Sequence, residues 1–195
     1  MASIDEIIED IYASGCEPDT ILEHLKNITS VNKIKRIIEE FQFDVTYNDN
    51  ELVLSARRAD IIELLLDYGA DPRANNDELL VYASSNGCSY NLIKRLLESG
   101  ADVNVNSNIL LCVISKQNDE TLKLVLDYGA NIKKTHICFA SRYCKLETLR
   151  ILLYYLDSQM LSNMCQGLQK CVEKANLLLS YNVPAEHILS IFLSE

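Results

Sequence analysis

Three stretches of the chain repeat the same order of apolar and polar residues. They read IIELLLDYGAD at 61–71, LIKRLLESGADVN at 92–104 and TLKLVLDYGANIK at 121–133. In each stretch aliphatic residues recur at i, i+3 and i+4, which places them on one face of a helix. Each helix then runs into Gly-Ala followed by Asp or Asn. A glycine at this place typically ends a helix, because without a Cβ it adopts the left-handed conformation at little cost.

The spacing of these helix ends indicates a repeat protein. Gly69, Gly100 and Gly129 are 31 and 29 residues apart. Shorter apolar helices open the copies, at 51–56, 78–84, 109–115 and 136–141. A helix pair of this size cannot bury its apolar face alone, so each copy depends on its neighbours. The pattern predicts an all-α stack of helical hairpins with buried residues at Leu65, Leu96 and Val125.

Polar residues mark where the first helices begin and where the pattern ends. Four residues have the position of an N-cap, a short polar side chain before a helix: Asn50, Asp77, Asn108 and Thr135. Ser3 and Glu6 have the spacing of a capping box. Gln42 stands where later copies have the helix-ending glycine, as expected of an atypical terminal repeat.

These observations divide the chain into three parts. Residues 1–46 are expected to form N-terminal helices and a degenerate capping repeat. Residues 47–157 are expected to hold the regular repeats, at about 47–74, 75–104, 105–133 and 134–157. Residues 158–195 are expected to form a degenerate repeat and a C-terminal capping helix.

The repeated residues resemble the ankyrin repeat, which opens with Thr-Pro-Leu-His-x-Ala and closes with Gly-Ala-Asp-Val-Asn. Residues 100–104 match the closing without exception, and Thr135, Ile137 and Ala140 match the opening. The resemblance covers about residues 30–183. The abundance of Leu, Ile, Asn and Tyr is similar to that in ankyrin proteins of large DNA viruses. The resemblance implies an ankyrin-type helical-hairpin solenoid with degenerate terminal caps.

Two departures from the family pattern change what we expect of the repeats. No copy keeps the proline, and the histidine positions hold Leu54, Val81, Leu111 and Cys138. We therefore expect apolar packing where the family has a Thr–His hydrogen-bond network. The period is shorter than the family's roughly 33 residues, so we expect shortened or vestigial β-turn fingers.

Charge and composition restrict the function further. The net charge is −10, and residues 1–71 carry all of it, with 16 Asp and Glu against 6 Lys and Arg. This acidity disfavours nucleic-acid binding, which needs a basic surface. No apolar run approaches the roughly 18 residues of a membrane span, and the acidic N-terminus does not resemble a secretory signal. We expect a cytoplasmic or nuclear protein whose seven cysteines are free thiols.

Candidate chemistry is weak throughout the sequence. There is no nucleophile elbow, phosphate-binding glycine loop or HExxH motif. His136, Cys138 and Cys144 could meet within one repeat, and Cys165 and Cys171 in the next, but no CxxC pair accompanies them. We expect no enzyme activity and no cofactor. A metal site or an enzyme in this C-terminal third is the alternative, and metal analysis of the purified protein separates the two.

In the ankyrin family, fingers and first helices line a concave groove that binds protein partners. Carried over to this chain, the groove yields the expected partner-binding residues Tyr82, Asn106, Lys116, Lys133, Lys134, His136, Phe139, Arg142, Tyr143 and Lys145. The aromatic residues are of the kind that anchors interfaces, although burial between helices is their alternative role. The cations make the fourth repeat locally basic, although a solvated rim is the alternative for them.

The resemblance and the charges favour a non-catalytic protein–protein interaction module. We expect it to act as an adaptor or a masking inhibitor, as a monomer, on a partner that offers an acidic segment. A structural homo-oligomer is a further alternative, which the concentration dependence of sedimentation would reveal.

Overall fold

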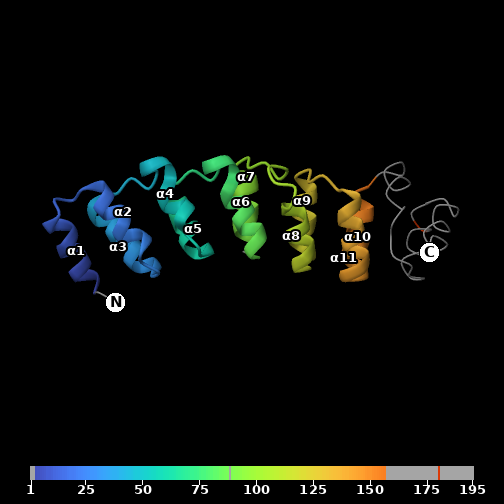
Figure 1. Cartoon of the computed structure of the whole chain (residues 1–195), viewed down its shortest axis with the longest axis horizontal. Helices are drawn as coiled ribbons and strands as arrows, with labels where there is room; N and C mark the ends of the chain where they lie inside the picture. The colour runs from blue at the N-terminus through green and yellow to red at the C-terminus, as the bar shows by residue number, and fades with distance from the viewer. Residues whose placement is uncertain (1–2, 88, 157–179, 181–195) are drawn as a thin grey trace. The chain divides into compact units, whose positions relative to one another are not determined.

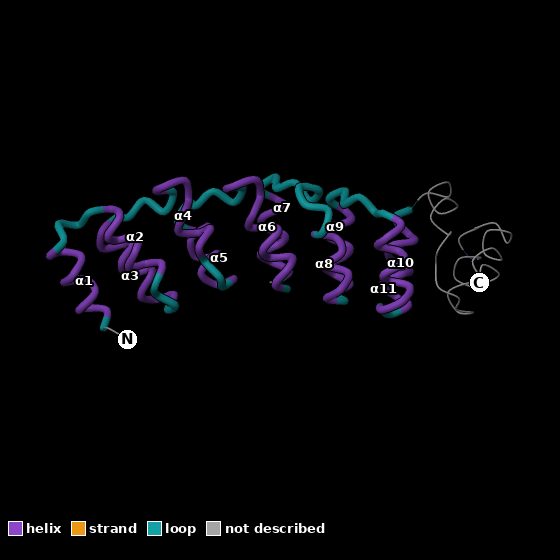
Figure 2. The backbone as a smooth tube through the Cα atoms, viewed as in Figure 1, coloured by secondary structure: helices purple, strands orange, loops and turns teal. Residues whose placement is uncertain are grey.

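The computed structural model describes residues 3–87, 89–156 and 180, which contain eleven helices and no strand (Figures 1 and 2). In chain order the helices are α1 (Ile4–Ala13), α2 (Pro18–Lys26), α3 (Val31–Phe41), α4 (Tyr47–Ser55), α5 (Ala59–Asp67), α6 (Ala74–Asn86), α7 (Tyr90–Glu98), α8 (Ile109–Lys116), α9 (Asp119–Asp127), α10 (Lys134–Tyr143) and α11 (Leu146–Tyr154). None of these described helices has the length and apolar character needed to cross a membrane. The repeat and capping helix expected at 158–195 lie outside the described residues, apart from Ser180.

The chain forms two compact units, and the described residues of each form stacked helical hairpins. The first unit comprises residues 1–79 and 98–101, and the second comprises 80–97 and 102–195. Within the first unit α2 packs against α4, and α3 packs against α5. Within the second unit α8 packs against α10, and α9 packs against α11. First helices thus contact first helices and second helices contact second helices, which confirms the predicted all-α, ankyrin-type fold class.

Aliphatic side chains of the second helices form the centre of each core. Leu65 of α5, Leu96 of α7 and Val125 of α9 have no exposed surface, as the apolar pattern predicts. Burying one such side chain stabilises the folded state by roughly 1.5–3 kcal/mol. The first helices contribute Val53, Leu80, Val113 and Ala140 to the same cores.

Polar contacts connect successive second helices near the helix ends. In the first unit the Tyr68 hydroxyl donates to Glu39 Oε1 at 2.6 Å. In the second unit the Tyr155 hydroxyl donates to Asp127 Oδ1 at 2.5 Å. The partners are 29 and 28 residues apart in sequence, which is one repeat. The same type of contact therefore recurs where one hairpin meets the next.

The helix-ending glycines adopt the predicted left-handed conformation. Gly69, Gly100 and Gly129 have φ angles of +95°, +88° and +83°. Beyond Gly129, the Ala130 N–H donates to the Val125 carbonyl at 3.0 Å and closes the end of α9. Gln42 also adopts positive φ, +47°, at the end of α3. The atypical repeat therefore keeps the geometry of the stop although it lacks the glycine.

Two left-handed turns of three residues precede right-handed helices in the first unit. Asn48–Asn50 have φ of 52°, 54° and 65°, and Asn75–Asp77 have φ of 51°, 57° and 59°. Asn and Asp adopt this conformation more readily than other residues with a Cβ, because their short polar side chains bond locally. The amide of Asn48 donates to the Glu51 carboxylate, and the amide of Asn75 donates to the Glu78 carboxylate. These turns lie at the starts of α4 and α6, in place of projecting β-turn fingers.

The predicted helix starts are correct in position in four of the five places tested. Ser3 and Glu6 form the expected capping box, with each side chain accepting from the other residue's backbone N–H. Asn50 and Asp77 directly precede the right-handed part of their helices. Asn108 borders α8 but makes no side-chain capping bond. The prediction for Thr135 is wrong, because α10 begins at Lys134 and Thr135 lies inside the helix.

We predict that Gly100→Val destabilises the protein by about 1–2 kcal/mol, because a branched side chain at positive φ is strained. A Cβ at Gly100 would meet no atom within 4 Å, so the cost arises from the backbone alone. Gly100→Asn is the matched control and should cost less, since Asn tolerates this conformation. Urea denaturation measures both variants. An unchanged midpoint for Gly100→Val would contradict the assignment.

We predict that Tyr155 makes stability depend on alkaline pH. The hydrogen bond to the Asp127 carboxylate is the main reason that the pKa of Tyr155 rises to about 12 from an ordinary value of 10.0. As pH rises above 10 the unfolded chain loses the Tyr155 hydroxyl proton before the folded chain does. The stabilisation that this hydroxyl gives the folded state is therefore complete below pH 10 and is lost as pH passes 12. When denaturation is measured at several alkaline pH values, the free energy of unfolding should fall less steeply with pH for Tyr155→Phe than for the wild type. Tyr128→Phe, at the end of α9, should retain the wild-type slope.

Candidate partner-binding surface

Besides the buried His136, six of the ten predicted partner-binding residues lie on α10 or directly beside it. We call them the α10 surface, and they are Lys133, Lys134, Phe139, Arg142, Tyr143 and Lys145. All ten predicted residues belong to the second unit. The sequence therefore selected residues of one unit, most of them on α10 or beside it.

The periodicity of α10 separates a buried face from an exposed aromatic stripe. Ile137 and Ala140 point into the core and are almost fully buried. Phe139, Arg142 and Tyr143, at i, i+3 and i+4, fall on the other face. The rings of Phe139 and Tyr143 lie 5.1 Å apart, a favourable separation for a tilted pair. Tyr143 remains 67% exposed while Phe139 is half-buried, so burial in the core does not account for Tyr143.

Cations stand at both ends of α10 and are exposed. Lys133 and Lys134 stand at its start, and Arg142 and Lys145 stand at or just beyond its end. Eight residues separate Lys134 from Arg142, which corresponds to roughly 12 Å along a helix. The α10 surface therefore presents an exposed aromatic ring close to one of two basic ends.

Contacts between α8 and α10 show that the two helices run in the same direction. His136, near the start of α10, is hydrogen-bonded to the Ser107 backbone just before α8. Cys144, just after α10, donates from Sγ to the Ile114 carbonyl near the end of α8 at 3.7 Å. The start of one helix therefore lies beside the start of the other.

This arrangement divides the remaining predicted residues between the two ends. Asn106 falls at the end occupied by Lys133, and its Oδ1 accepts from the Asn108 N–H at 2.9 Å. Lys116 falls at the opposite end with Arg142, on the rim of a cavity of about 260 Å³ beside Gly87. Tyr82 is half-buried on α6, and its carbonyl accepts from the Asn86 amide at 3.0 Å. Asn106 and Lys116 border α8, which packs against α10, whereas Tyr82 belongs to α6.

His136 lies in the interior and is only 3% exposed. Its Nδ1 accepts from the Lys133 N–H at 3.1 Å, which holds the first turn of α10. Burial lowers the pKa of His136, the nearby Lys133 charge lowers it further, and the Ser107 hydrogen bond partly offsets both effects. A buried ring does not present itself to a partner, so His136 supports the α10 surface from beneath. It also supplies hydrogen bonds where we expected only apolar packing.

The sequence reasoning missed Asn104 as a link between repeats. Its Oδ1 accepts from the Asn131 N–H at 2.9 Å, and its Nδ2 donates to the Gly129 carbonyl at 3.0 Å. In the first unit the Asn50 Oδ1 accepts from the Asp71 N–H at 2.8 Å in the same way. The signal was available, because Asn104 closes the Gly-Ala-Asp-Val-Asn stretch. Its amide positions the loop that leads to Lys133 and Lys134.

The described residues offer little catalytic or metal-binding chemistry. Over residues 3–87 and 89–156, no group of three or more His, Cys, Asp or Glu side chains could hold a metal ion. Cys138 and Cys144 form no disulfide in this region. Cys165 and Cys171, the other members of the alternative metal site, lie outside the described residues.

We predict that His136→Phe destabilises the protein by about 1–3 kcal/mol, because the Lys133 N–H loses its acceptor. Because the folded-state pKa of His136 is lowered, the unfolded chain takes up the proton first below an ordinary value of 6.5. The wild-type free energy of unfolding should therefore fall as pH drops below about 6.5, and the variant should lose part of this slope. Equal slopes for the two proteins would contradict the assigned role. The measurement is urea denaturation across this pH range.

Comparisons with known proteins agree with the repeat pattern and the helical hairpins. The family model described as ankyrin repeats, in three copies, matches residues 6–107 and 80–164. An ankyrin repeat protein of Acanthamoeba polyphaga mimivirus is 24% identical over 141 residues, which cover 66% of this chain and 32% of that protein. This chain therefore spans about a third of the length of that relative, and the resemblance to viral ankyrin proteins is confirmed. No solved structure matches the chain. Since the family model covers most of the sequence, the chain belongs to the ankyrin repeat family.

Proposed function

We propose that the chain is an adaptor or masking inhibitor that holds an acidic segment of a partner protein on the α10 surface. Ankyrin repeats are generally protein–protein interaction modules and are typically non-enzymatic. The observation that carries the proposal is the exposed Tyr143 ring, packed against Phe139 and accompanied by Arg142 and Lys145.

The aromatic pair would supply most of the affinity. Interface energy is concentrated in a few residues, and tyrosine is among the commonest of them. Phe139 restricts the position of the Tyr143 ring, so little conformational freedom is lost when a partner covers it. An exposed ring already supported on one side is well suited to serve as an anchor.

The cations would select the charge of the partner. Lys133 and Lys134 stand at one end of α10, and Arg142 and Lys145 at the other. Exposed charges of this kind raise the association rate of an oppositely charged partner and suppress like-charged ones, with modest gain in affinity. An extended acidic segment that crosses Tyr143 could approach both basic ends, which are roughly 12 Å apart.

We predict that reversing Lys133, Lys134 and Lys145 to Glu weakens capture of the partner from lysate of the native cell, because repulsion replaces attraction. Capture is quantified with the full chain immobilised, and circular dichroism verifies that the helices are intact. Tyr143→Ala should also weaken capture, by about tenfold or more, with less dependence on salt.

The matched control reverses Lys94, Lys123 and Arg150 to Glu. These residues are exposed on α7, α9 and α11, so the net charge changes equally while the α10 surface stays intact. If both triple variants capture the partner equally well, the proposal is wrong and the partner binds elsewhere.

A further inference from the structure

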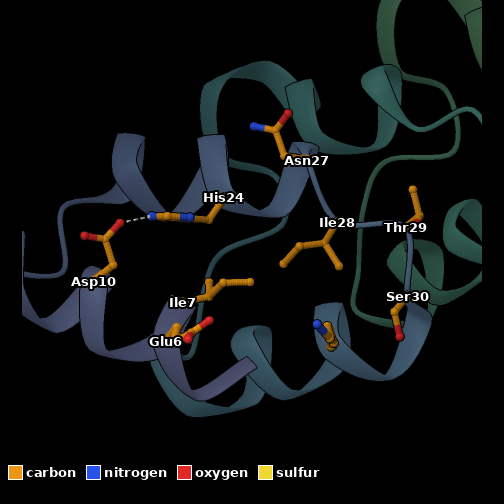
Figure 3. Close-up of a pocket in the computed structure, with 9 residues that line it drawn as sticks. Glu6, Ile7, Asp10, His24, Asn27, Ile28, Thr29 and Ser30 are labelled. Atoms are coloured by element: carbon orange, nitrogen blue, oxygen red, sulfur yellow. Dashed lines mark ion pairs between the residues drawn. The ribbon is translucent and has the colours of Figure 1, made fainter. Parts of the chain in front are cut away.

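A cavity of about 560 Å³ opens between α1, the end of α2 and the start of α3, all in the first unit (Figure 3). Ile7 of α1 and Ile28 after α2 point toward one another across it, and both are half-buried. Glu6 and Asp10 of α1 form one wall, and His24 of α2 and Asn27 just after α2 form another. The cavity therefore combines an apolar floor with two carboxylates on a single helix.

The packing of α2 explains why this cavity exists. One side of α2 contacts α4, where the Tyr47 hydroxyl donates to Asp19 at 2.8 Å and the Lys26 ammonium donates to Glu51 at 2.6 Å. His24 is two residues before Lys26, a rotation of about 200°, and therefore lies on the opposite side. In the regular repeats a neighbouring first helix covers this side of a first helix, as α2 covers α4.

Only α1 is present beside this side of α2 in the described part of the first unit, and it also packs against α3. Asp5 of α1 pairs with Arg36 of α3 at 3.0 Å, and the rings of Tyr12 and Phe41 lie 5.1 Å apart. These contacts place α1 in line with the second helices, next to α3. The space that a first helix would take beside α2 remains as the cavity.

Charge distinguishes the possible occupants of the cavity. Residues 1–71 hold 16 acidic against 6 basic side chains, and the cavity lining includes Glu6 and Asp10 against one lysine, Lys33. Asp10 Oδ2 lies 3.0 Å from His24 Nε2, so a ring nitrogen already stands beside this carboxylate. A second copy of the same acidic surface would be repelled. A basic occupant with an aliphatic stripe matches both the wall and the floor.

We propose that this cavity is a docking site for an amphipathic helix of a partner protein, with lysine or arginine beside its aliphatic stripe. The helix packs on the free side of α2 as α2 itself packs on α4. Its aliphatic side chains cover Ile7 and Ile28, and its cations face Glu6 and Asp10. This site lies in the first unit and is distinct from the α10 surface of the second.

The test measures binding of a labelled synthetic helix of leucine and lysine, with leucine at i, i+3, i+4 and i+7, by fluorescence anisotropy on the full chain. We expect the double variant Ile7→Ala and Ile28→Ala to weaken binding by about tenfold or more, because the aliphatic contact is lost. The matched control, Leu64→Ala with Ile132→Ala, removes half-buried aliphatic side chains elsewhere and should bind as the wild type does.

A charge variant tests the acidic wall separately. The Asp10 side chain is 71% exposed, so Asp10→Asn leaves the fold intact and should weaken binding and reduce its salt dependence. Asp67→Asn, on exposed α5 surface, should have no effect. Three results would overturn the proposal. The first is equal binding of a leucine–glutamate helix, and the second is unchanged binding by both cavity variants. The third is displacement of the peptide by a second copy of the chain, as measured by sedimentation.

Discussion

Each hairpin can cover its aliphatic face only with the hairpin beside it, and this dependence organises both units. Leu65, Leu96 and Val125 lie at equivalent places in successive second helices and are fully buried. The hydrogen bonds that accompany this burial are also periodic, since Tyr68 reaches Glu39 and Tyr155 reaches Asp127 one repeat earlier. Cohesion is therefore local in sequence, and contacts between distant parts of the chain contribute little. Proteins dominated by such short-range contacts fold fast and can unravel from their ends.

The apolar period and the glycines were sufficient to predict the hairpins, because they report backbone conformation directly. Gly100 has the predicted left-handed φ, and the helix faces are buried as predicted. The left-handed turns at 48–50 and 75–77 were not predicted. Asparagine and aspartate serve equally as helix caps and as left-handed residues, so the sequence alone does not distinguish these two uses. Thr135 was misplaced for a related reason, since His136 rather than a preceding hydroxyl satisfies the first turn of α10.

The sequence predicted where the residues of the candidate site lie along the chain better than it predicted which of their side chains are exposed. The family resemblance supplied Phe139, Arg142 and Tyr143, and the structure places them on one face of α10 with Tyr143 exposed. The resemblance could not show that His136 faces inward, because its burial depends on the loop that brings Ser107 against it. Two surfaces of the molecule carry opposite charge: the one around α1 and α2 is acidic, and the one around α10 is basic. A protein with two such surfaces could engage two chemically different partners.

The three-residue turns at the starts of α4 and α6 have a consequence for how any partner would contact these helices. Left-handed backbone folds the connection tightly onto the helix that follows, and Glu51 and Glu78 bind the leading asparagines in place. A connection folded in this way has no projecting tip that could contact another molecule. A molecule that docks beside either turn must therefore supply the protruding element itself.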